Sequence, residues 1–182
     1  MNIETEHPPH KKDTPRNRAF VDYIISRCQA DNGLRAALKR ADNPATEYQS
    51  WEVLAGFNIN LEHENQRLPY ATIAAAIART KVEKNGATKI GQAIARCYED
   101  GNTSDQAKAR LRRLLACDSV PEACRILRPL FSLIEAKGGV TLNYAQLLDD
   151  LLWFGHEDSQ LRIKARWAQD FYGKTATGGQ DD

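Results

Sequence analysis

The sequence contains no long apolar run and no export signal. None of its hydrophobic stretches approaches the roughly 18–20 residues that a membrane-spanning helix requires. The first 15 residues are polar and include the pairs His7-Pro8 and Lys11-Lys12, which is unlike a secretory signal peptide. We therefore expect a cytoplasmic protein that makes no contact with membranes.

Cysteine and histidine are too few and too scattered to form a metal site. The four cysteines are Cys28, Cys97, Cys117 and Cys124, and no two of them have C-x-x-C spacing. We interpret them as reduced, buried, small apolar residues. The four histidines are dispersed, and there is neither a P-loop nor a G-x-G-x-x-G motif. The sequence therefore predicts no metal and no cofactor.

No set of residues indicates an active site. A nucleophilic triad needs a histidine beside a serine or cysteine and an acid, and the four dispersed histidines make one improbable. Asp149 and Asp150 are adjacent on a predicted helix and point apart, which argues against a two-metal nuclease. His156-Glu157-Asp158 precedes another helix, whose positive end suits carboxylates. We predict no enzymatic activity. The alternative interpretation is a hydrolase that uses Asp149, Asp150, His156 or Glu157.

Helical periodicity covers most of the chain, and no useful length alternates like a strand. We predict an all-α, compact helical bundle made of two packed lobes, residues 19–102 and 103–172, between flexible tails at 1–18 and 173–182. The helices are expected at 19–29, 34–40, 45–56, 70–80, 89–98, 104–116, 119–138, 144–154 and 158–172. Residues 57–68 are interpreted as a loop, after which Pro69 opens the alanine-rich helix.

Local signals sharpen some of these boundaries and faces. Thr103 with Gln106, and Asn143 with Gln146, have the spacing of capping boxes. The aromatic residues near the C-terminus are interpreted as core rather than as platforms for stacking bases. They are Trp153, Phe154, Trp167, Phe171 and Tyr172.

The formal net charge is only +1, but basic residues concentrate in the middle of the chain. Residues 69–137 hold 12 Lys and Arg against 7 Asp and Glu, whereas residues 1–68 hold 9 against 10 and residues 138–182 hold 4 against 7. The helix at 104–116 is the most basic, with Lys108 and Arg112 four residues apart on one face. Such like charges repel unless something neutralises them, and phosphates would do so. A solvated face that pairs with Asp105 or Glu122 explains the same pattern.

Further basic elements occur along the chain, without a scaffold that reads DNA bases. They are Arg35 with Lys39 and Arg40, Lys81 with Lys84 and Lys89, Arg125 with Arg128, and Arg162 with Lys164 and Arg166. There is no zinc finger and no basic zipper, which favours contact with the nucleic-acid backbone. The main alternative is a helical adaptor that binds another protein through its basic face.

Five segments, in this order, resemble the CasB family, the small subunit of the type I-E CRISPR complex Cascade. They are RAALKR at 35–40, KIGQAIARCY at 89–98, ARLRRLLACD at 109–118, LLWFGHED at 151–158 and RIKARWAQDFYG at 162–173. Each segment alone is a weak signal, whereas the ordered set is fairly specific and its closing segment is the most telling. The long tails and the loop at 57–68 depart from the family pattern.

The resemblance implies an α-helical, two-lobed protein without an active site. Members of the family lie as a head-to-tail pair beside the crRNA, in contact with the backbone and large subunits of Cascade. The implied role is to hold the displaced non-target strand and to steady the target strand of the R-loop. Carried over motif by motif, the nucleic-acid contacts are Arg35, Lys39, Arg40, Lys89, Arg110, Arg112, Arg113, Arg125, Arg128, Arg162 and Arg166.

Overall fold

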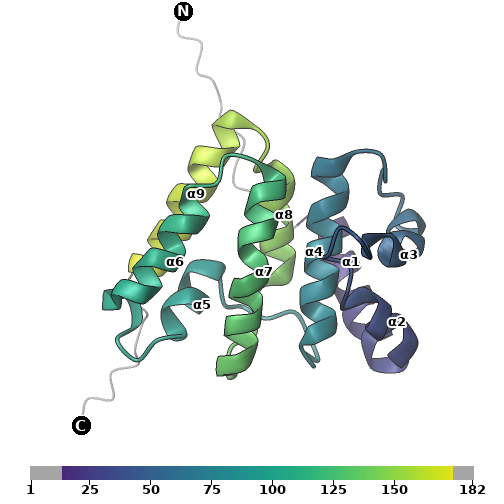
Figure 1. Ribbon diagram of the computed structural model, residues 1–182, viewed down its shortest axis with the longest axis horizontal. Coiled ribbons are helices and arrows are strands. Elements are labelled where there is room, and N and C mark those ends of the chain that lie inside the picture. Colours follow the sequence, from purple (N-terminus) through teal and green to yellow (C-terminus); the bar gives the residue numbers. More distant parts are fainter. Residues whose placement is uncertain (1–13, 174–182) are drawn as a thin grey trace, which may run out of the picture.

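The structure, a computed structural model, describes residues 14–173, and this part of the chain is built from helices (Figure 1). The α-helices are α1 (Pro15–Ala30), α2 (Asn32–Leu38), α3 (Trp51–Gly56), α4 (Glu64–Arg79), α5 (Ile90–Arg96), α6 (Asp105–Leu115), α7 (Val120–Lys137), α8 (Tyr144–Trp153) and α9 (Glu157–Tyr172), with 3-10 turns η1 (Glu47–Ser50) and η2 (Gly101–Thr103). The β-type pairing within residues 14–173 is an isolated bridge between Thr88 and Leu142. The predicted all-α class is confirmed.

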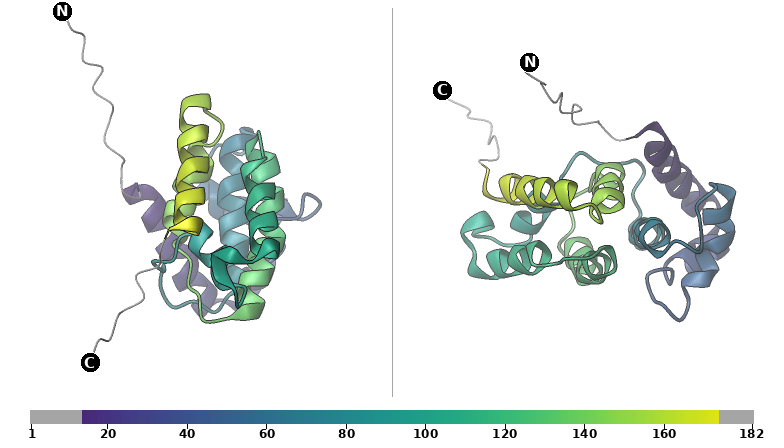
Figure 2. Two further views of the ribbon diagram at one scale, coloured as in Figure 1. Left: turned by 90° about the vertical axis from the view of Figure 1, so that its left-hand side faces the viewer. Right: turned by 90° about the horizontal axis from the view of Figure 1, so that it is seen from above.

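Helix α4 lies at the centre of the molecule. It contacts α1, α2 and α3 on one side and α7 and α8 on the other (Figure 1). All residues from Pro69 to Ala78 are buried, because alanine at half of these positions lets neighbouring helices approach closely. Beyond α4, α6 and α7 form one layer and α8 and α9 a second (Figure 2, right). The division into two lobes remains a prediction. Helix α5, which belongs to the predicted N-terminal lobe, packs most extensively against α9 of the predicted C-terminal lobe.

The first helix begins earlier than predicted. The expected tail of residues 1–18 is wrong for residues 15–18, because α1 begins at Pro15, a residue whose fixed φ suits the first helical position. Thr14 is anchored to α8, since its backbone N–H donates to Asp149 Oδ2 at 2.8 Å and its hydroxyl to Oδ1 at 3.0 Å. Residues 1–13 and 174–182 of the predicted tails lie outside the described residues.

The segment between α2 and α4 also departs from the predictions. The helix expected at 45–56 is a series of turns followed by η1 and the short α3. The loop expected at 57–68 is too long, because α4 begins at Glu64 and holds Pro69 in its interior. Proline is most often tolerated at the first helical turn, which explains why the sequence pattern placed the start of α4 too late.

Side-chain caps hold several helix starts, among them those of α6, α7 and α8. At α7, Ser119 Oγ accepts from the backbone N–H of Glu122 at 3.3 Å. At α8, Asn143 Oδ1 accepts from that of Gln146 at 3.0 Å, as predicted. For α6 the predicted cap is one residue off. Ser104, not Thr103, accepts from the N–H of Ala107, while the Thr103 hydroxyl donates to the carbonyl of Asp100 at 2.7 Å. Thr103 therefore belongs to the preceding turn.

The predicted core is confirmed for most residues. The four cysteines are free and buried, and burial raises the pKa of the Cys117 thiol to about 11, which keeps it protonated and unreactive. Phe154, Trp167 and Phe171 are buried, and the first two stack at a centroid distance of 5.5 Å. Trp153 and Tyr172 are 56% and 50% exposed, so the core assignment of those two residues is wrong.

Candidate nucleic-acid interface

Two arginines bind one carboxylate between the turn after α2, the end of α4 and α7, and two further cations directly precede that turn in the chain. The side chain of Asp42, in the turn after α2, is only 2% exposed. Both of its oxygens accept hydrogen bonds from Arg79 at the end of α4. One of them also lies 3.4 Å from Nε of Arg128 on α7. We call Lys39, Arg40, Asp42, Arg79 and Arg128 the seam cluster, and its four positive charges and one negative charge sum to +3.

Arg79 is the member of the seam cluster that the sequence did not reveal. Its Nη2 donates to the carbonyl of Lys39 at 2.9 Å, which ties α2 to the end of α4. The hydrogen bonds to Asp42 raise the pKa of the Arg79 guanidinium above its ordinary value, against the opposing effect of burial. Arg79 follows a run of apolar residues and belongs to no charge pattern, and only its position at the helix end could have drawn attention to it.

The early basic element has two roles in the structure. Nε of Arg35 donates to the carbonyl of Ala78 at 2.9 Å, at the negative end of α4, where a cation is favourable. Lys39 and Arg40 are exposed next to it. Arg35 therefore holds α2 on α4, whereas Lys39 and Arg40 present their charges to solvent.

The three arginines of α6 surround its solvent side. The buried face of α6 is formed by Ala107, Leu111 and Leu114. Arg112 and Arg113 are exposed and Arg110 is half-buried. At 100° per residue, Arg110 and Arg113 lie on one flank of this face and Arg112 lies on the other. Within residues 14–173, none of the three forms an ion pair, so their charge is available to a partner.

Within the described part of the chain, the alternative pairing with acidic neighbours occurs for Lys108 but not for the arginines of α6, and Glu122 pairs with Arg125 of its own helix. Lys108 Nζ lies 3.9 Å from Asp105, and Arg125 lies 3.8 Å from Glu122, each on its own helix. Both carboxylates are solvent-accessible, and such surface pairs contribute little to stability. Arg125 and Arg128 are three residues apart and share one side of α7, which extends the seam cluster along that helix.

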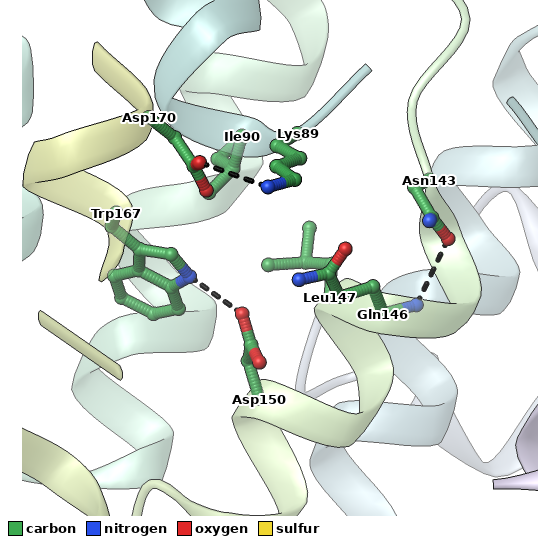
Figure 3. A pocket seen from close by; sticks show the side chains of 8 residues that line it. All are labelled: Lys89, Ile90, Asn143, Gln146, Leu147, Asp150, Trp167 and Asp170. Atoms are coloured by element: carbon green, nitrogen blue, oxygen red, sulfur yellow. Dashed lines mark hydrogen bonds and ion pairs between the residues drawn. The ribbon is translucent and has the colours of Figure 1, made fainter. Parts of the chain in front are cut away.

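Two predicted contact residues bind carboxylates of neighbouring helices, and Figure 3 shows the first of these pairs, between Lys89 and Asp170. Lys89 Nζ lies 3.1 Å from Asp170 of α9. Arg166 donates to Asp150 of α8, whose other oxygen accepts from Trp167 Nε1 at 2.7 Å. Lys89 and Arg166 thus join α5, α8 and α9. Arg162, one turn before Arg166, is exposed. The structure brings Lys89 and Arg166 to neither the seam cluster nor the α6 arginines.

The carboxylates singled out as rival catalytic groups have structural partners. Asp149 holds the start of α1 through Thr14 and Asn17, while Asp150 points to the other side of α8 and holds α9. Glu157 occupies the first turn of α9, as expected for a carboxylate at a helix start.

Asp150 gives folding a defined pH dependence. Burial raises its pKa to about 6 from 3.8, and the nearby Arg166 charge only partly opposes this. Between these values the folded state binds more protons than the unfolded state, so the free energy of unfolding falls as pH rises. Relative to Asp150→Asn, the free energy of unfolding of the wild type should fall by about 3 kcal/mol between pH 4 and 7.5. Urea unfolding of both proteins at the two pH values measures this difference. If the wild type instead became more stable than Asp150→Asn as pH rises, the charge of Arg166, and not burial, would set the pKa of Asp150.

Residues 34–172 match the family model of CRISPR-associated protein Cse2. This chain belongs to the Cse2 family. The resemblance to CasB, the other name under which solved members of the family appear, is thereby confirmed. No helix of residues 14–173 of this Cse2-family chain combines the length and apolarity needed to cross a membrane.

Individual relatives agree with the family assignment. CRISPR-associated protein Cse2 of Thermus thermophilus is 38% identical over 96 residues, which are 52% of this chain and 52% of that relative. The matched part thus spans about half of that relative's length. M. ruber CasB is 25% identical with a TM-score of 0.69, over 86% of this chain and 92% of that one. A chain of a CRISPR RNA-guided surveillance complex has the same fold, with 21% identity and a TM-score of 0.64 over 86% and 89%.

Proposed function

We propose that this Cse2-family chain is a non-catalytic small subunit of a type I-E CRISPR surveillance complex. In that role it binds the phosphate backbone of nucleic acid through its basic helix faces and stabilises the R-loop. Its partners are the backbone and large subunits of Cascade, a second copy of itself arranged head-to-tail, and the crRNA–target DNA R-loop. The family assignment and the fold shared with a chain of a surveillance complex support this proposal.

The observation that carries the proposal is the convergence of the seam cluster. Arg79 of α4 and Arg128 of α7 are far apart in sequence, yet they meet around the one buried carboxylate of Asp42, and the exposed Lys39 and Arg40 directly precede that turn in the chain. A net charge of +3 in one place costs free energy unless counter-charges are supplied, and a polyanion supplies them. Strand exchange in an R-loop is nearly balanced in energy, so modest backbone contacts are enough to favour it.

The structural roles of the acidic groups support a non-catalytic role. Asp149 and Asp150 hold α1 and α9 rather than facing a common site. A subunit that binds strands without regard to sequence needs cations on rigid helices and no reactive group. The cytoplasm, where crRNA and invading DNA meet, is the compartment that fits this role.

Titration of a fluorescent mixed-sequence single-stranded DNA with the protein at several salt concentrations tests the proposal. We expect the logarithm of the association constant to fall linearly with the logarithm of salt concentration, by about 0.7 for each phosphate contacted. A protein-binding adaptor, the second reading of the basic faces, would bind no DNA at low salt. The same titration with the assembled complex would then show whether the site needs its partner subunits.

A further inference from the structure

The seam cluster contains a buried acid in the middle of a surface that should attract anions. Asp42 is among the least exposed carboxylates of residues 14–173, and it removes one positive charge from a surface proposed to bind phosphate. Two roles are conceivable for such a group. It either lowers the affinity for phosphate by neutralisation or raises it by fixing the geometry of the arginines.

The contacts of Arg79 show that Asp42 is held rigidly. Arg79 donates from Nη1 and Nη2 to the two oxygens of Asp42, a paired arrangement that fixes the plane of the carboxylate. Its Nη2 also donates to the carbonyl of Lys39. These three hydrogen bonds use three of the five guanidinium donors, and the Arg79 side chain is only 24% exposed. Arg79 therefore serves mainly to support Asp42.

Arg128 has the opposite arrangement. It approaches Asp42 through Nε at 3.4 Å, and no contact within residues 14–173 uses its Nη1 or Nη2. Its side chain is 38% exposed. The ion pair through Nε leaves Nη1 and Nη2 of Arg128 able to donate to another group, and these two nitrogens form a fork that matches two phosphate oxygens. The exposed Lys39 and Arg40 lie in the neighbouring segment.

We infer that Asp42 is a positioning residue, which Arg79 fixes and which in turn orients Arg128 to bind a phosphodiester of the nucleic acid. This inference rests on the proposed function and adds to it an order of action, from Arg79 through Asp42 to Arg128. The proposed binding point lies between two parts of the molecule, because Asp42 and Arg79 belong to the N-terminal segments and Arg128 belongs to α7.

The sign of the effect of Asp42→Asn decides between the two roles. Removal of a negative charge strengthens DNA binding if Asp42 only neutralises. If Asp42 orients Arg128, the variant binds single-stranded DNA about tenfold more weakly, as expected for loss of one charge-assisted contact, and the salt slope falls by about 0.7. Asp105→Asn is the matched control, because its side chain is 102% exposed and the charge change is the same. The control should bind at least as tightly as the wild type.

Two further variants separate positioning from a general loss of structure. In an Arg128→Ala background, Asp42→Asn should have no further effect on affinity, because the group that it positions is absent. Arg128→Gln removes the charge that contacts phosphate, and should lower the affinity and the salt slope by the same amounts even if Asp42→Asn proves too unstable to assay. Tighter binding by Asp42→Asn, or an unchanged slope in Arg128→Gln, would overturn the inference. Wild-type protein that binds no DNA would instead count against the proposed function.

Discussion

Replacement of Arg110, Arg112 and Arg113 by glutamine is expected to weaken binding of single-stranded DNA about 100-fold without unfolding the protein. Each charge-assisted phosphate contact contributes about 0.5–1.5 kcal/mol, and three contacts together correspond to roughly two orders of magnitude. The salt slope should fall by about two. Because none of these side chains has an ion pair within residues 14–173, their removal leaves no buried carboxylate without a partner.

The matched control keeps the charge at the same positions. Replacement of the three arginines by lysine should leave the affinity within a few-fold of wild type, since phosphate attraction depends mainly on charge. Equal binding by the glutamine variant and the wild type would mean that α6 has only a solvated face, and the seam cluster would then be the remaining candidate. Thermal unfolding of all three proteins should coincide, because only Arg110 is partly buried.

Gly91→Ala is expected to destabilise the fold by about 3 kcal/mol, the upper part of the range for overpacked sites. A Cβ at position 91 would lie 2.3 Å from the carbonyl oxygen of Trp167 and 2.7 Å from the backbone nitrogen of Phe171. These are main-chain atoms of α9, so no side-chain rotation can relieve the contact. Chemical denaturation followed by tryptophan fluorescence measures the loss.

Gly56→Ala is the matched control for Gly91→Ala. Gly56 ends α3, and a Cβ there would meet nothing within 4 Å. Alanine also restricts the unfolded chain more than glycine does, so this variant should be neutral or slightly stabilising. Similar losses for the two variants would mean that the close approach of α5 to α9 is not what position 91 requires.

Local signals allowed much of the fold to be predicted, and long-range contacts account for most of the differences. The cap at Asn143 could be predicted because donor and acceptor are three residues apart. The start of α4 at Glu64 could not, since Pro69 within the helix is tolerated only when packing on both sides holds the helix together.

The candidate interface shows the same limit. Basic patterns located Lys39, Arg40 and Arg128 but missed Arg79, whose importance lies in a carboxylate 37 residues away. The pattern also gave Lys89 and Arg166 the same role as the exposed arginines. Their partners Asp170 and Asp150 are on other helices, and nothing in the local sequence reveals which cations are paired. The contact of each of these residues with nucleic acid stays a prediction.

The central position of α4 has a consequence for how the protein unfolds. Its residues 69–78 supply buried surface to helices on both sides, so neither group of helices has a complete core of its own. Separation of the two groups would expose this apolar helix to water, at a cost comparable with the stability of a whole domain. The chain should therefore melt in one cooperative transition, and neither half should be obtained as a folded fragment by limited proteolysis.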